Sequence, residues 1–199
     1  ERIFVSNEKD NTISVIDGAS LEVVETIPVG RRPRSMAFSS DGSELFVAVG
    51  DDEAIDMIDL ESLRVVRSQA SGDDPEVIRV DPNRPYIYVS NEDDNIVSVL
   101  DYEARTLVTE IPVGVEPEGL GISPDGRWLV STTETSNMAH IIDTETMEAV
   151  HHRLVGARPR HAEFTHDGRE AWVSAEIAGT VSILDMEETF DVKHTIRFD

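Results

Sequence analysis

The sequence repeats itself every 42 residues, without an insertion or a deletion, and this period constrains the fold more than any single motif. Three residue types recur in register. The aspartates are Asp17, Asp59, Asp101, Asp143 and Asp185; the glycines are Gly30, Gly72, Gly114 and Gly156; and the prolines are Pro33, Pro75, Pro117 and Pro159. Such self-similarity is typical of repeat proteins, in which each unit buries its apolar surface against its neighbours.

Four short segments of each repeat are rich in the β-branched and aromatic residues that favour strands. In the first repeat these segments are Ile3–Ser6, Thr12–Ile16, Val23–Ile27 and Met36–Phe38. Tight hairpin turns, for which glycine accepts a positive φ, are indicated at Asp41-Gly42, Asp125-Gly126 and Asp167-Gly168. No segment is typical of a helix. Four-stranded antiparallel units at this period predict an all-β fold, the β-propeller.

The register predicts where the strands of a blade lie. From the channel outward we expect strands at about 34–39, 44–49, 53–59 and 63–69, and a last outer strand near Asp191–Arg197. As a single domain, residues 1–199 hold about 4.7 blades, too few for a ring of about six to eight. We therefore expect a partial ring of a seven-bladed propeller that lacks about two blades and a closing strand at its C-terminus. A five-blade ring missing one inner strand is the alternative.

Composition excludes several classes of partner and site. Forty acidic residues face seventeen basic ones, for a net charge of −23, and such a surface repels nucleic acid and anionic lipid. No apolar run is long enough to predict a membrane span. The absence of cysteine excludes disulfides, thiolate metal sites and cysteine nucleophiles.

Several segments resemble the YVTN β-propeller family, and this likeness extends over the whole chain. They are Phe4–Asn7, Thr26–Gly30, Tyr88–Asn91, Glu110–Gly114 and Ser123–Gly126. Other segments are most similar to the subgroup associated with pyrroloquinoline quinone (PQQ)-dependent catabolism. These are Ser6–Asn11, Gly30–Arg34, Val115–Gly119, Thr135–His140 and Arg158–Phe164.

The resemblance implies a setting rather than an activity, because it supplies no catalytic residues to transfer. It implies an exported, periplasmic protein, with a signal peptide that has been removed or lies outside this sequence. The expected partners are a quinoprotein dehydrogenase or components of an ABC exporter. PQQ is the one cofactor that the resemblance suggests, by association with the pathway.

The loop that enters each inner strand differs from repeat to repeat. Because proline directs the chain inward, we expect the residue after it at the channel mouth. These residues are Arg34, Glu76, Glu118 and Arg160, with His161 beside the last. Arginine offers a planar fork that matches carboxylates, so the rim predicts a site for a small acidic ligand. The alternative is that the arginines pair with the glutamates and tie adjacent blades together.

Two inner-strand charges, Arg79 and Glu163, are predicted to line the channel or to form an ion pair between blades. The acidic turns at 7–11, 50–53, 91–95 and 134–137 lack any calcium-loop pattern and are interpreted as solvated turns. The six histidines lie at repeat positions too far apart to share a metal ion. The sequence contains no nucleophile elbow, phosphate-binding loop or zinc-protease motif.

These observations favour an exported, non-catalytic propeller that binds a ligand or a protein in PQQ-linked alcohol oxidation. One alternative is a propeller enzyme, either lactonase-like or quinoprotein-like. Two tryptophans and no cysteine count against a full quinoprotein dehydrogenase. The other alternative is a surface-layer repeat protein, against which the divergent mouth loops count.

Overall fold

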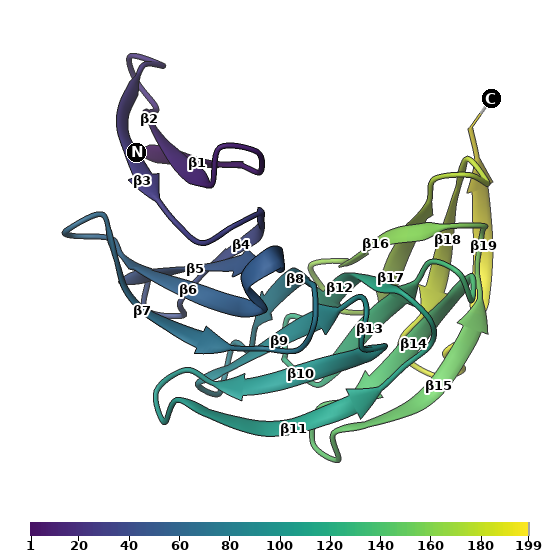
Figure 1. Cartoon of the computed structure of the whole chain (residues 1–199). Helices are drawn as coiled ribbons and strands as arrows, with labels where there is room; N and C mark the ends of the chain where they lie inside the picture. The colour runs from purple at the N-terminus through teal and green to yellow at the C-terminus, as the bar shows by residue number, and fades with distance from the viewer. Residues whose placement is uncertain (199) are drawn as a thin grey trace.

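Five antiparallel sheets form an open arc in the computed structural model, which describes residues 1–198 (Figure 1). The first sheet has three strands and the other four have four each. Strands that follow one another in sequence are neighbours within each sheet, so each sheet is one continuous meander. The predicted all-β fold, a partial β-propeller, is confirmed.

The bounds of the strands follow the repeat. The first sheet contains β1 (Arg2–Asn7), β2 (Thr12–Asp17) and β3 (Val23–Pro28). The second contains β4 (Pro33–Phe38), β5 (Glu44–Val49), β6 (Ala54–Asp59) and β7 (Arg64–Ala70), and the third contains β8 (Pro75–Val80), β9 (Tyr86–Asn91), β10 (Ile96–Asp101) and β11 (Thr106–Pro112). The fourth contains β12 (Pro117–Ile122), β13 (Trp128–Thr133), β14 (Met138–Asp143) and β15 (Glu148–Leu154). The fifth contains β16 (Pro159–Phe164), β17 (Glu170–Ala175), β18 (Thr180–Asp185) and β19 (Val192–Arg197).

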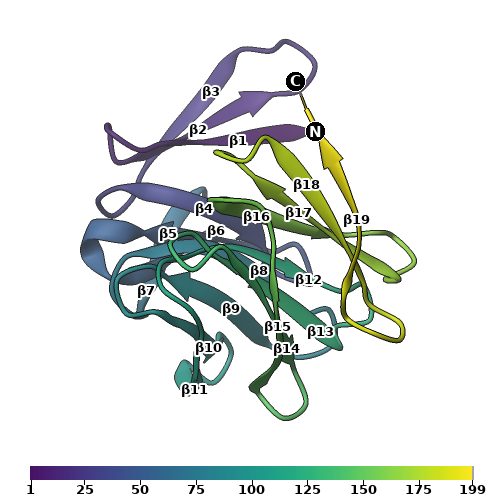
Figure 2. The ribbon, with the colours of Figure 1, turned by 90° about the vertical axis from the view of Figure 1, so that its right-hand side faces the viewer.

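The strands predicted from the register agree with these bounds within about one residue, whereas the predicted segment Met36–Phe38 begins three residues after the start of β4. One short 3₁₀ turn, η1 (Gly50–Asp52), joins β5 to β6. No helix in the described part of the chain is long and apolar enough to cross a membrane. The first and last sheets lie on either side of the open arc in Figure 1, although the two termini project close together in Figure 2.

The core lies between the sheets, because each interior sheet buries both of its faces. Phe46 and Met57 of the second sheet pack against Ile87, Leu100 and Tyr102 of the third. The rings of Phe46 and Tyr102 lie 5.0 Å apart. Burial of such large apolar side chains is the main source of stability here, because the chain has no cysteine and residues 1–198 form no α-helix.

Two glycines allow the inner strands β12 and β16 to approach closely. A Cβ atom added to Gly119 would lie 2.6 Å from the carbonyl oxygen of Arg160, and one added to Gly121 would lie 2.6 Å from that of Ala162. Any larger residue would push the two strands apart. The close approach brings the start of β12, with Glu118, beside the start of β16, with Arg160.

The repeat fails once, in the turn between β18 and β19. In the fourth sheet Ala139 pairs with Arg153, whereas in the fifth the corresponding Val181 pairs with Ile196, one residue further on than the period requires. The longer turn carries Phe190, whose ring lies 4.6 Å from that of His151 and 4.8 Å from that of Trp128. The prediction of a period without insertion is therefore wrong at this turn, where the extra residue accompanies an aromatic contact with the fourth sheet.

Candidate functional site at the channel mouth

The loops that enter the inner strands hold the residue before each proline in the left-handed region. These residues are Arg32, Asp74, Glu116 and Arg158, with φ between 51° and 58°. For a residue other than glycine this conformation costs about 1 kcal/mol or more, and it persists where the surrounding structure enforces it. In three of the loops, a side-chain amide oxygen from the preceding sheet holds this conformation by accepting a hydrogen bond from the backbone N–H. Asn11 accepts from Arg32 N, Asn95 from Glu116 N and Asn137 from Arg158 N.

A β-bulge follows each of these prolines. The register of β4 shifts between Pro33 and Met36, and the other inner strands show the same irregularity after Pro75, Pro117 and Pro159. Bulges re-aim side chains and are common next to functional sites. Those that lie in the four bulges are Arg34, Glu76, Glu118 and Arg160, the residues that the sequence analysis placed at the mouth.

These four side chains meet. The Nη2 atom of Arg34 lies 2.5 Å from Oε2 of Glu76 and 3.6 Å from Oε1 of Glu118. The Nη2 atom of Arg160 lies 2.7 Å from the same Glu118 oxygen. One chain of ion pairs therefore joins the inner strands of four sheets, and it matches the alternative in which arginines tie adjacent blades together.

A second layer of charged side chains surrounds this row of ion pairs, and the sequence patterns did not predict it. Arg32 Nη2 lies 2.7 Å from Oε1 of Glu76, and Arg32 also pairs with Asp74. Arg158 Nε lies 2.8 Å from Oε2 of Glu134, which Arg160 also contacts. The signal was present in the repeat, because the residue before each proline varies in the same basic, acidic, acidic, basic order as the residue after it.

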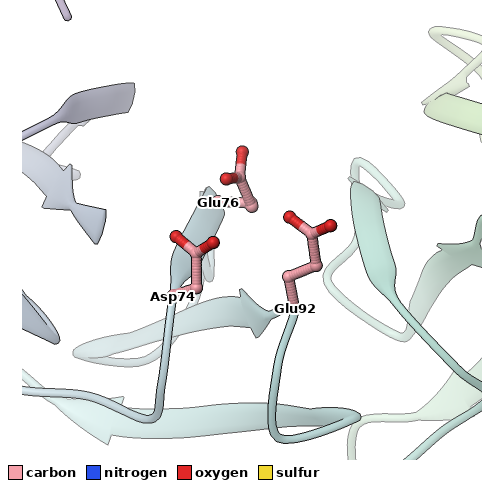
Figure 3. A group of neighbouring side chains, drawn as sticks. All are labelled: Asp74, Glu76 and Glu92. Carbon is pink, nitrogen blue, oxygen red and sulfur yellow. The ribbon is translucent and has the colours of Figure 1, made fainter. Parts of the chain in front are cut away.

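The carboxylates outnumber the arginines at the centre of the mouth. Ligand oxygens of Asp74, Glu76 and Glu92 all lie within 4.8 Å of one another, converging from the loop before β8, from β8 and from the turn after β9 (Figure 3). The three carboxylates offer the oxygen ligands that a divalent cation takes. Arg32 already pairs with Asp74 and Glu76, however, so we assign the group to the ion-pair network and not to a metal site.

Glu92 differs from its counterparts in the other repeats. Glu8 and Glu134 occupy the same repeat position and are each paired with two arginines of the next sheet. Opposite Glu92 the next sheet places Glu116 and Glu118 instead. Within residues 1–198, Glu92 has no cationic side chain within ion-pair distance.

Crowding and burial shift the ionisation of these groups. The Glu76 side chain is 2% exposed, and its burial, together with the neighbouring Glu118 carboxylate, raises its pKa to about 7 despite the hydrogen bond from Arg34. Burial also raises the pKa of Glu92 and of Glu118. The mouth therefore contains a carboxyl group that exchanges its proton near neutral pH.

A cavity of about 260 Å³ opens beside this group. Its wall combines both charges of the central ion pair with hydroxyl groups and a proline ring. The lining residues are Ser6, Glu8, Pro33, Arg34, Ser35, Glu76, Val77 and Glu118. A small polar ligand in this cavity would contact a guanidinium, a titrating carboxyl and hydroxyl groups at once.

The remaining predicted site residues lie outside this cavity. The Nη2 atom of Arg79 lies 3.9 Å from Oε2 of Glu163, so the two form a long ion pair from the third sheet to the fifth. Burial lowers the pKa of Arg79. The imidazole of His161 is half exposed, with its Nε2 atom 3.6 Å from the same Glu163 oxygen. The arrangement corresponds to the ion pair between blades that the sequence analysis kept as an alternative.

Comparison with known proteins places the chain among β-propellers. The model of the YNCE-like β-propeller family matches residues 1–82, and that of the family described as lactonase, 7-bladed β-propeller, matches residues 51–155, slightly more than half of the sequence. No curated protein matches the chain.

Solved structures resemble the fold closely. Hydrazine synthase of Kuenenia stuttgartiensis superposes with a TM-score of 0.85 at 23% identity, covering 94% of this chain and 60% of that one. A protein of unknown function from Desulfotomaculum acetoxidans gives a TM-score of 0.85 at 16% identity, covering 100% and 68%. The chain thus spans less than two thirds of the hydrazine synthase chain, and at these identities the likeness shows the fold alone. By its match over residues 51–155, the chain belongs to the lactonase family of seven-bladed β-propellers.

Proposed function

We propose that the channel mouth hydrolyses a lactone. One observation carries this proposal: the buried carboxyl of Glu76, with a pKa of about 7, accepts a hydrogen bond from Arg34 at 2.6 Å in the wall of the cavity. General-base catalysis is most efficient when the pKa of the base lies near the working pH. The family match includes Glu76 and Glu118 and supports the same reaction class.

The chemistry assigns different roles to the two side chains. The Glu76 carboxylate takes a proton from a water molecule while the water oxygen attacks the lactone carbonyl carbon. The negative charge that develops on the carbonyl oxygen is stabilised by the Arg34 guanidinium. When the intermediate collapses, the bond from the carbonyl carbon to the ring oxygen breaks, and the ring oxygen takes the proton from Glu76. The product is a hydroxy acid, and the base is regenerated.

Hydrolysis by the purified protein tests this proposal. Glucono-δ-lactone, dihydrocoumarin and γ-butyrolactone are each followed by pH-stat against a buffer blank. We expect hydrolysis of at least one lactone, with a rate that rises through about pH 7 as Glu76 loses its proton. Rates equal to the blank for all three lactones across this pH range would overturn the proposal.

A second candidate function is the non-catalytic binding of an acidic ligand such as PQQ, a tricarboxylate. The supporting observation is that Arg34 and Arg160 flank Glu118, so two guanidinium forks lie near one cavity. The segments similar to PQQ-associated propellers support the same ligand and an exported protein that acts beside a quinoprotein dehydrogenase. Calorimetric titration with PQQ, together with an assay of alcohol oxidation with PQQ and calcium supplied, separates this candidate from an enzyme. Binding without turnover of lactones or alcohols supports it, and the absence of binding refutes it.

A further inference from the structure

We propose that a carboxylate which binds to Arg34 at the mouth enters together with one proton, which Glu76 takes up. The inference rests on the proposed function, because the carboxylate is either the hydroxy acid released from a lactone or an acidic ligand of the same cavity. It adds a regulatory property: the site holds anions more tightly at lower pH.

Each of the three nitrogen atoms of the Arg34 guanidinium already contacts a protein carboxylate. Its Nε atom donates to Glu76 at 2.6 Å, and its Nη2 atom lies 2.5 Å from Glu76 and 3.6 Å from Glu118. Its Nη1 atom donates to Glu8 at 3.2 Å. An incoming carboxylate that binds this guanidinium therefore competes with these protein carboxylates and weakens their contacts.

Glu76 is the protein carboxylate most affected by this competition. Glu76 makes the shortest contacts with Arg34, yet only 2% of it is exposed, so it cannot turn into water when those contacts weaken. A buried carboxylate that loses its cation is costly, and protonation removes that cost. Glu8, by contrast, has a half-exposed side chain and can remain ionised.

The surroundings of Glu76 favour the same outcome. Two guanidiniums and three carboxylates lie close to it: Arg32 from the loop before β4, Arg34 from β4, Asp74 from the loop before β8, Glu92 from the turn after β9 and Glu118 from β12. Glu8, from the turn after β1, pairs with the same two arginines. An additional anion increases this excess of negative charge. The pKa of Glu76, about 7 without a ligand, would then rise further.

The expected consequence is a linked equilibrium. When binding consumes a proton, the dissociation constant rises with pH above the pKa of the free protein, by up to about tenfold per pH unit. Around pH 7.5 the complex should take up between about half and one proton, because Glu76 is mostly ionised before the anion arrives.

Isothermal titration calorimetry tests this directly. Gluconate, as a hydroxy acid, and PQQ, as a tricarboxylate, are titrated at pH 7.5 into the purified protein in three buffers with different enthalpies of ionisation, and again at pH 6.5 and 8.5. We expect the observed enthalpy to depend on the buffer with the slope of proton uptake, and the affinity to fall as the pH rises. In Glu76→Gln both effects should disappear, whereas Glu103→Gln, in an exposed turn at the opposite face, should behave as wild type.

The outcomes separate the inference from the function on which it rests. Uptake with gluconate supports the product of lactone hydrolysis as the anion, and uptake with PQQ alone supports the acidic-ligand candidate. Binding of either probe without buffer dependence in the wild-type protein overturns the inference and leaves the proposed site in place. If neither probe binds and no lactone is hydrolysed, the proposed function and the inference both fail.

Discussion

The pKa values of the hairpin-turn aspartates on one face of the arc and of the buried glutamates at the mouth are shifted in opposite directions. At the turns between inner and second strands, the Asp41 carboxylate accepts hydrogen bonds from the Ser39 hydroxyl at 2.7 Å and from Ser43 N at 3.0 Å, which lower its pKa to about 2. The equivalent Asp125 and Asp167 also have lowered pKa values, because hydroxyls of nearby residues donate to them. At the mouth, burial raises the pKa of Glu76 to about 7.

The two faces differ in where the partners of their carboxylates come from. The turn aspartates find their hydrogen-bond partners within two residues, so these contacts are local to each turn, and the lowered pKa values keep the carboxyl groups ionised at neutral pH. The mouth glutamates depend on arginines from other repeats, 42 or 44 residues away in the case of Glu76. Only the second arrangement produces a group that titrates near pH 7, which favours the mouth as the functional face.

Glu76→Gln should cause the largest functional loss. Glutamine preserves the shape and can still accept a hydrogen bond from Arg34, but it cannot take a proton from water. We expect kcat for lactone hydrolysis to fall by about 100-fold or more. Circular dichroism and thermal melts check that the variant folds, and Glu103→Gln serves as the matched control. A variant within about threefold of wild type would place the base elsewhere.

Replacing Arg34 and Arg160 together with glutamine should weaken both the ligand site and the contacts between sheets. Glu76 and Glu118 would lose guanidinium partners, so we expect gluconate or PQQ to bind at least about tenfold more weakly and the Tm to fall. Calorimetry and thermal melts measure the two effects. Unchanged binding with a lower Tm would mean that the arginines only tie the blades together.

His140 holds the loop that leads to Glu116, and we expect it to make the stability of the fold sensitive to acid. Its Nε2 atom accepts a hydrogen bond from Gly114 N at 3.1 Å, in the loop that leads to Glu116. Burial and the neighbouring His152 lower its pKa from 6.5 to about 4. The unfolded chain therefore binds this proton more readily, and stability should be lost as the pH falls from about 6.5 to 4.

His140→Ser tests this dependence, since serine occupies the same repeat position at Ser14, Ser98 and Ser182. The loss of Tm between pH 6.5 and 4 should be smaller in this variant than in wild type. An identical pH profile would show that other groups control the acid sensitivity.

Asp41→Asn should have the smallest effect and confine it to stability. The amide keeps the shape of the turn but weakens its charge-assisted hydrogen bonds, so the Tm should fall by no more than about 3 °C. Lactone hydrolysis and anion binding should be unchanged. A loss of activity comparable with that of Glu76→Gln would remove the contrast between the two faces.

Local patterns predicted the strands and turns well, because each repeat encodes its own hairpins. They also identified Arg34, Glu76, Glu118 and Arg160 as mouth residues, since proline and the bulge after it recur in register. The partners Arg32 and Glu134 and the direction of the pKa shift of Glu76 were not predicted. Both depend on which side chains of different sheets meet, and residue spacing within one repeat does not contain that information. The extra residue between β18 and β19 was hidden for a similar reason, because only strand pairing reveals it.

Both the proposed catalysis and the proposed proton uptake depend on the ionisation of Glu76. In protein labelled with ¹³C at the glutamate carboxyl carbons, the resonance that disappears in Glu76→Gln is followed from pH 4 to 9. We predict a midpoint near pH 7. A midpoint at or below about 4.5, the ordinary value for glutamate, would contradict it, because an ordinary carboxylate at the mouth would be neither a poised base nor a proton acceptor for an incoming anion.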